Sequence, residues 1–197
     1  MKTVNPIALA ITVGLSILPL RAQAATDPKA AAAPAMPRPK PGPEMEKLKP
    51  MIGTWQVEEL HEPGFMGPGG KGHGIGHVTL GPGGLSLQIN YQSGSGHMKG
   101  FKGHGILAWD AEAKCYKQAW SDNMMPMIMT STGNWDGADF VMNTEGTMMG
   151  KPFKSQDRFT GIGPGGFTLT TEMSMDGGPM KKVMTLVHRR SKAEARK

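Results

Sequence analysis

The sequence predicts an all-β fold, a single antiparallel up-and-down β-barrel of about ten strands with a short N-terminal helical turn. From Gly53 onward, short runs rich in β-branched and aromatic residues alternate with glycine turns. The tetrapeptide Gly-Pro-Gly-Gly, which is typical of turns, occurs at 67–70, 81–84 and 163–166. No window after residue 50 shows helical periodicity. A meander of short strands protects its edges most completely by closing into a barrel.

The predicted elements follow one another between turn residues. Glu44 to Leu48 can form one helical turn before Pro50. Asp-Gly pairs at 136–137 and 176–177 predict tight hairpins. The predicted strands are 53–61, 72–80, 85–92, 101–109, 115–121, 126–133, 138–145, 151–160, 166–175 and 180–190.

The N-terminus has the pattern of a signal peptide. Lys2 is followed by the largely apolar segment from Ile7 to Leu20, and Ala22-Gln23-Ala24 is typical of a cleavage site. The apolar segment is short for a membrane span, so the sequence predicts export to the periplasm or the medium and no membrane span. The predicted organisation is a signal peptide (1–24), an Ala/Pro-rich disordered linker (25–43), a barrel domain (44–190) and a basic tail (191–197).

The basic composition is a property of the ends of the chain. The whole chain carries a formal charge of +6. Within 51–188, however, twelve acidic residues outnumber ten lysines and arginines. This distribution argues against a nucleic-acid-binding groove. The single cysteine, Cys115, excludes an internal disulfide, so stability must come from an apolar core.

The residues Gly53-Thr54-Trp55, after a short helical turn, resemble the start of the calycin barrels, the lipocalins and their fatty-acid-binding relatives. The resemblance implies that Trp55 closes one end of the barrel and that a late basic residue, here Arg189, packs across its ring. A cation over an indole face is favourable, the more so when desolvated.

A longer pattern narrows the resemblance. It comprises Gly-Thr-Trp, the segment FKGHGILAWDAEAKCYKQAWSDNMMPMIMTSTGNWDG at 101–137, and VMTLVHRR at 183–190. It is similar to an exported bacterial family catalogued as domain of unknown function 1579. That family implies a calycin-like fold and no established activity. The long Ala/Pro linker and the methionine enrichment are departures from it.

Methionine is the unusual residue of this sequence. Of its seventeen methionines, eleven lie between Met124 and Met184. Methionine fills irregular space and is common on adaptable binding surfaces. The sequence therefore predicts an interior that binds an apolar or amphipathic small molecule; the alternative is a filled core in a barrel that acts through a protein partner. The predicted ligand wall is Tyr91, Trp120, Met127, Met129, Met142, Phe159 and Met173.

The sequence predicts that the protein binds no cofactor. Its histidines and methionines suggest two alternatives, copper and haem. Copper would use thioethers and imidazoles such as those of His73, His77 and His104, but no compact ligand array is present. Haem would use His188, by resemblance to nitrobindin-like barrels. Those barrels follow Gly-x-Trp with closely spaced glycines, which this chain lacks.

No sequence pattern indicates a catalytic site, and the prediction is that the protein is not an enzyme. Gly-Ile-Gly-Pro-Gly-Gly at 161–166 is followed by a predicted strand instead of the helix that a phosphate-binding loop needs. No Gly-x-Ser-x-Gly or His-Glu-x-x-His occurs. Asp110 and Asp122 fit turn hydrogen bonding better than paired-carboxylate hydrolysis.

Overall fold

The computed structural model describes residues 37–64 and 66–191. The predicted signal peptide lies outside the described residues, as do residues 25–36 of the predicted linker and residues 192–197 of the predicted tail. Among the residues described, no helix is long and apolar enough to cross a membrane.

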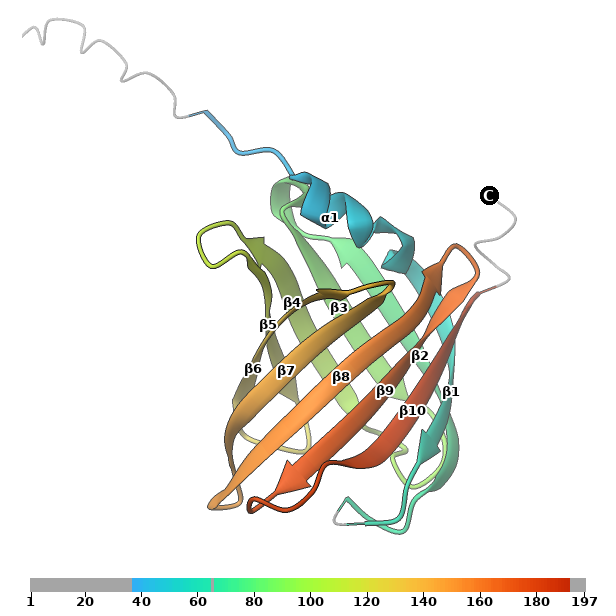
Figure 1. Cartoon of the computed structure of the whole chain (residues 1–197). Helices are drawn as coiled ribbons and strands as arrows, with labels where there is room; N and C mark the ends of the chain where they lie inside the picture. Colours follow the sequence, from blue (N-terminus) through green and yellow to red (C-terminus); the bar gives the residue numbers. More distant parts are fainter. Residues whose placement is uncertain (1–36, 65, 192–197) are drawn as a thin grey trace, which may run out of the picture. The chain divides into compact units, whose positions relative to one another are not determined.

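The described chain forms a closed antiparallel barrel in which every strand pairs with its neighbours in sequence and β1 pairs with β10 (Figure 1). Neighbouring strands are joined by short loops, so the barrel is an up-and-down meander. The strands are β1 (Gly53–His61), β2 (Gly70–Leu80), β3 (Ser86–Ser93), β4 (Lys102–Asp110), β5 (Cys115–Asp122), β6 (Ile128–Asp136), β7 (Asp139–Met148), β8 (Lys151–Gly163), β9 (Gly166–Met175) and β10 (Lys181–Arg190).

The predicted fold class is confirmed, and the strand limits differ from the predicted ones by a few residues. β8, for example, continues beyond residue 160 to Gly163. The pairing of β8 with β9 is irregular between Thr160 and Gly163, and Gly161 there has a φ of 63°. Glycine tolerates this left-handed conformation, so the strand continues through a bulge that the sequence pattern reads as a turn.

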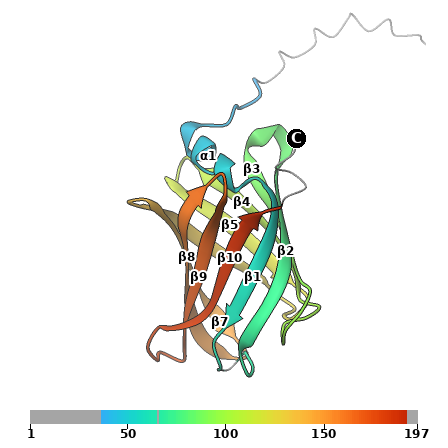
Figure 2. The same ribbon diagram turned by 90° about the vertical axis from the view of Figure 1, so that its right-hand side faces the viewer.

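One end of the barrel, here called the α1 end, lies beneath the helix α1 (Pro43–Lys47) and the 3₁₀ helix η1 (Lys49–Met51) (Figures 1 and 2). Pro43 begins α1, where its missing N–H costs nothing. The Tyr116 hydroxyl on β5 donates to the Glu44 carbonyl at 2.8 Å, which fastens the helix to the barrel. The helical segments bury Met45, Leu48 and Met51.

The opposite end, here called the loop end, is formed by the five loops 62–69, 94–101, 123–127, 149–150 and 176–180. These loops join β1 to β2, β3 to β4, β5 to β6, β7 to β8 and β9 to β10. The hydrophobic core lies toward the α1 end. Its strand members are Trp55, Val57, Val78, Leu87, Leu107, Tyr116, Phe140, Met142, Phe167 and Leu186.

Trp55 is completely buried beneath η1. Its indole Nε1 donates to the Met51 carbonyl at 2.8 Å, and its ring meets the edge of Phe167 at 5.1 Å. The prediction of Arg189 as the residue across Trp55 is wrong. The guanidinium of Arg190 lies 4.5 Å from the indole centroid, whereas Arg189 is exposed and bound to Glu58. Arg190 is the register partner of Trp55, and paired residues face the same side of a sheet.

Candidate functional site

The inward faces of the strands differ between the two ends of the barrel. At the α1 end, inward side chains such as Trp55, Leu107 and Phe140 are at most 1% exposed. Toward the loop end, inward side chains including Trp120 and Met129 are only half-buried, although neighbouring strands surround them. A solid core would bury these side chains too. The loop-end half of the interior, here called the lumen, therefore contains space.

Glycines on the inward faces of β2 and β4 help to keep this space. The Tyr91 side chain lies against Gly74, where an added Cβ would overlap the phenol ring. The Trp120 indole lies against Gly103 and Gly105 in the same way. Both aromatic rings thus lie along the barrel wall and leave the centre of the lumen less filled than rings pointing across it would.

A buried carboxylate, Glu59 on β1, forms the centre of a polar cluster in the lumen. Its Oε1 accepts a short hydrogen bond from the Tyr91 hydroxyl, and its Oε2 lies 3.1 Å from Nε2 of His61. Burial alone would raise the pKa of Glu59, but the hydrogen bonds from His61, Tyr91 and Ser93 outweigh it and lower that pKa. Burial and the adjacent Glu59 carboxylate raise the pKa of Tyr91. Glu59 is therefore an ionised group whose two oxygens are already engaged.

A second inward carboxyl, Asp157 on β8, lies where the core meets the lumen. Its register partners are Met142 of the core on β7 and Thr171 on β9. Burial raises the pKa of Asp157, and the Thr171 hydroxyl, which donates to Oδ1 at 2.5 Å, opposes that shift only in part. Oδ2 has no hydrogen-bond partner among the described residues.

The amide of Gln118 on β5 also faces the lumen without a partner in the part of the chain that the structure describes. Within that part, every fully buried side-chain nitrogen or oxygen is hydrogen-bonded. The Gln118 amide and Oδ2 of Asp157 must therefore border space that water or a ligand can reach. By contrast, Ser131 and Thr144 satisfy each other across β6 and β7 at 2.7 Å.

The predicted wall residues fall into three groups. Tyr91, Trp120, Met129 and Met173 face inward and are half-buried in the lumen. Met127 lies in the loop before β6, because that strand begins at Ile128. The other two belong to the packed core: Met142 is 1% exposed, and the partly buried Phe159 packs against that core.

Three of the predicted histidine alternatives, His73, His77 and His104, line one hollow on the outside of the barrel, apart from His188. His73, His77 and His104 are exposed on the outer faces of β2 and β4. Within the described residues, no group of three or more histidine, cysteine, aspartate and glutamate side chains could hold a metal ion.

His188 lies inside the barrel near the α1 end. It is stacked on Phe167 with ring centroids 4.1 Å apart, and burial lowers its pKa to about 4. Its Nδ1 lies 3.3 Å from the Leu186 carbonyl. The Phe167 ring covers one face of the imidazole and the Leu186 carbonyl lies beside Nδ1, so these contacts hold His188 within the apolar core.

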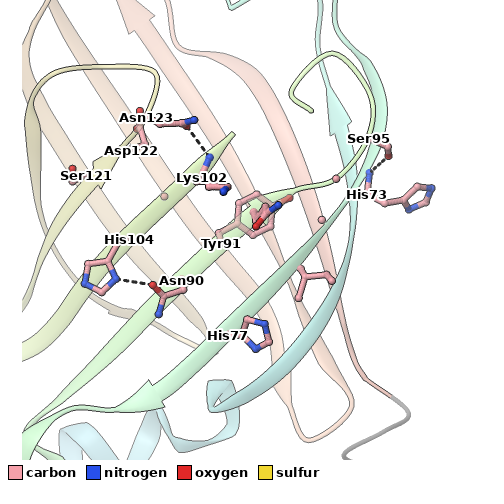
Figure 3. A pocket seen from close by; sticks show the side chains of 15 residues that line it. His73, His77, Asn90, Tyr91, Ser95, Lys102, His104, Ser121, Asp122 and Asn123 are labelled. Carbon is pink, nitrogen blue, oxygen red and sulfur yellow. Dashed lines mark hydrogen bonds between the residues drawn. The ribbon is translucent and has the colours of Figure 1, made fainter. Parts of the chain in front are cut away.

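A hollow of about 840 Å³ lies over β2 to β5, lined mainly by outward side chains (Figure 3). Several of its polar groups are already paired. His104 Nδ1 lies 2.9 Å from Asn90 Oδ1, and the Lys102 backbone N–H donates to Asn123 Oδ1 at 2.8 Å. His77 lies 3.2 Å from the Thr54 hydroxyl. The outward polar side chains that line this hollow are exposed to solvent, whereas Gln118 and Asp157 are partly buried inside the barrel, so the lumen is the stronger candidate site.

Sequence analysis missed Glu59 and Asp157, although the two-residue period of the strands could have found both. Glu59 is in phase with Trp55 and Val57, and Asp157 is in phase with Phe153 and Phe159. A carboxylate in phase with large apolar residues is a buried charge, and buried charges are rare without a partner or a function.

A comparison with protein families identifies the family to which this chain belongs. The profile of a family described as "Protein of unknown function (DUF1579)" matches residues 40–190. The chain belongs to the DUF1579 family. A comparison with curated proteins finds no significant match.

Solved structures similar to this DUF1579 barrel include Rv2717c from M. tuberculosis, at a TM-score of 0.54 and 13% identity, covering 78% of this chain and 100% of that one. They also include the S-type phycobiliprotein lyase CPES from Guillardia theta, at a TM-score of 0.50 and 11% identity, covering 77% of this chain and 99% of that one. At these identities the similarity shows a shared calycin-like barrel fold, which is compatible with ligand binding.

Proposed function

We propose that this DUF1579 protein binds an amphipathic small molecule in its lumen, and that it does so after export, as its N-terminal sequence predicts. The observation that carries the proposal is the inward Gln118 amide and Asp157 Oδ2, which lack partners among the described residues. Partnerless polar groups beside interior space are typical of ligand pockets, where a few polar groups fix the orientation of an otherwise apolar ligand.

The walls of the lumen supply the apolar side of such a site. Trp120 offers the face of a large ring, and Met129, Met173 and Met184 offer flexible thioether chains from β6, β9 and β10. Methionine adapts to ligand shape at little cost. A binding role explains these features with no catalytic group assigned, and the phycobiliprotein lyase is similar in fold alone.

Native mass spectrometry of protein purified without refolding, followed by denaturing extraction, tests the proposal directly. We expect an additional mass that is released on denaturation. The ligand-free protein should also bind uncharged decanol, measured by Trp fluorescence or calorimetry. Failure to retain a native ligand and to bind any medium-chain amphiphile would contradict the proposal.

A matched pair of serine variants locates the site. Ser155 faces inward on β8, opposite Met173, whereas Ser121 on β5 faces outward. Ser155→Phe should place a ring in the lumen and lower the affinity for decanol at least about tenfold, which corresponds to about 1.4 kcal/mol. Ser121→Phe should leave the affinity unchanged. Equal effects of both variants would exclude the lumen as the binding site.

A further inference from the structure

We infer that the ligand carries a cationic, hydrogen-bond-donating group next to its apolar part, and that Asp157 binds this group. The inference rests on the proposed function and specifies its ligand class: an amphiphilic amine instead of a fatty acid. The inference follows from three observations: the carboxyl groups inside the lumen, the positions of the lysines and arginines, and the lack of a hydrogen-bond partner for Oδ2 of Asp157 among the described residues.

Inside the lumen, away from its rim, the inward strand positions that carry an acidic or basic side chain hold carboxyls. Glu59 and Asp157 lie within the lumen, and Asp122 lies at its rim. Asp122 is engaged, because its oxygens accept hydrogen bonds from Trp120 Nε1 and from the backbone N–H groups of Met124 and Met125. The nearest inward imidazole, that of His61, is bound to Glu59.

The basic side chains of the described residues lie at the rim of the lumen or outside it. Every lysine among them is exposed. Lys151 and Lys181 hold inward register positions, opposite Met148 and Met173, at the rim of the loop end, where Lys151 is paired with Asp176. The half-buried Arg158 binds Asp136 and Asp139 across the barrel surface. Arg190 packs over Trp55 at the α1 end.

A carboxylate ligand whose head group reached the depth of Asp157 would therefore meet like charge, with the described lysines no nearer than the rim. Burying such a charge without a cationic partner is costly. An ammonium group, by contrast, would find a carboxyl oxygen ready to accept its hydrogen bond.

Asp157 is the inward carboxyl best able to receive that group. Both oxygens of Glu59 already accept hydrogen bonds, whereas Oδ2 of Asp157 lacks a partner among the described residues and borders the lumen. Asp157 also lies at the boundary of the core, beside Met142. An ammonium group held there would leave its alkyl chain to extend along Met129, Met173 and Met184 toward the loop end.

The test compares three ligands of equal chain length, decylammonium, decanol and decanoate, by calorimetry at pH 7 on the ligand-free protein. We expect decylammonium to bind at least about tenfold more tightly than decanoate, because hydrogen bonds between charged groups exceed neutral ones. Asp157→Asn should abolish this preference, measured as the ratio of the decylammonium and decanoate affinities of the same variant. Glu172→Gln, which alters the exposed carboxylate next to Thr171 on β9, should preserve the preference.

Each outcome separates this inference from the proposed function. Decanoate binding as tightly as decylammonium would overturn the inference and leave the binding function intact. A preference for decylammonium that survives Asp157→Asn would overturn the role of Asp157. Binding of none of the three ligands would overturn both. The wild-type comparison needs no variant, so poor folding of Asp157→Asn could not hide the answer.

Discussion

The α1 end and the loop end of this barrel are built from the same ten strands, yet their inward faces differ. At the α1 end a run of aromatic rings from Trp109 through Tyr116, Phe140 and Phe159 to Phe167 packs edge to face or tilted, with centroids 4.9–6.2 Å apart. At the loop end, carboxyls, amides and hydroxyls share the interior with methionines. The comparison teaches that the main apolar core lies at the α1 end, whereas the loop end combines a few buried apolar side chains, such as Met148 and Phe153, with polar groups and space.

The methionines follow the same division. Each of the five loops at the loop end contains at least one methionine, whereas the loops 81–85, 111–114, 137–138 and 164–165 at the α1 end contain none. Met124, Met149 and Met180 at the loop end are exposed. Flexible apolar side chains thus surround the end of the barrel where the lumen lies.

Truncating one tryptophan at each end should give the largest effect. Trp55→Ala leaves a large cavity in the core and should destabilise the protein by about 3–5 kcal/mol, measured by urea unfolding. Trp120→Ala, which removes a half-buried ring from the lumen wall, should cost only about 1–2 kcal/mol. Equal losses for the two variants would contradict the division into core and lumen.

The two arginines that end β10 provide the next test. Arg190→Gln removes the contact over Trp55 and hydrogen bonds to the carbonyls of Pro50, Ile52 and Pro164. It should destabilise by about 2–3 kcal/mol. Arg189→Gln removes only an exposed pair with Glu58 and should cost less than about 0.5 kcal/mol. A larger loss of stability for Arg189→Gln than for Arg190→Gln would contradict the β1–β10 register, in which Arg190 lies opposite Trp55.

Two inward glycines test the fit of the aromatic rings. A Cβ at Gly103 would overlap the Trp120 indole, whereas a Cβ at Gly76 would lie 3.7 Å from Trp55 in ordinary contact. Gly103→Ala should therefore cost about 1–3 kcal/mol and shift the Trp fluorescence as the indole moves into the lumen. Gly76→Ala should be neutral, or stabilising by up to about 1 kcal/mol. Urea unfolding curves and Trp emission spectra of Gly103→Ala and Gly76→Ala measure these effects. Equal stability and unchanged emission of the two variants would contradict the close packing of Trp120 on Gly103.

The raised pKa of Asp157 predicts a pH-dependent cost of keeping this carboxyl inside the barrel. Between the ordinary pKa and the raised one, the folded state binds more protons than the unfolded state, so this group's contribution to stability falls as pH rises. Asp157→Asn removes that dependence. Its stability relative to wild type should therefore increase from pH 4 to pH 7. A difference independent of pH would show that Asp157 titrates normally.

Mild peroxide oxidation should produce the smallest change in the protein and still distinguish the two ends. We expect sulfoxide first at Met149 and Met124, which are 89% and 61% exposed, with Met51 and Met142 protected in the core. Peptide mass spectrometry as a function of time measures the order. Early oxidation of Met142 would show that the core is open to solvent.

Much of the fold was readable from the sequence, because strand periodicity and turn chemistry are local. Glycine turns and Asp-Gly hairpins predicted the number of strands and most of their limits. Of the predicted wall, Tyr91, Trp120, Met129 and Met173 do face the lumen, since alternation assigns a side chain to one face of its strand. Alternation does not give height along the barrel, so Met142 and Phe159 were predicted as wall residues although they pack in the core.

The sequence by itself therefore determined an all-β barrel closed near Trp55, with an apolar core that needs no disulfide. Only the tertiary structure decided that Arg190 and not Arg189 covers Trp55, that Tyr91 meets Glu59, and that methionines from five loops gather at one end. The physical reason is that these contacts depend on the register between strands far apart in sequence. In a closed barrel that register is set by the stagger of all the strands together and not by any single segment.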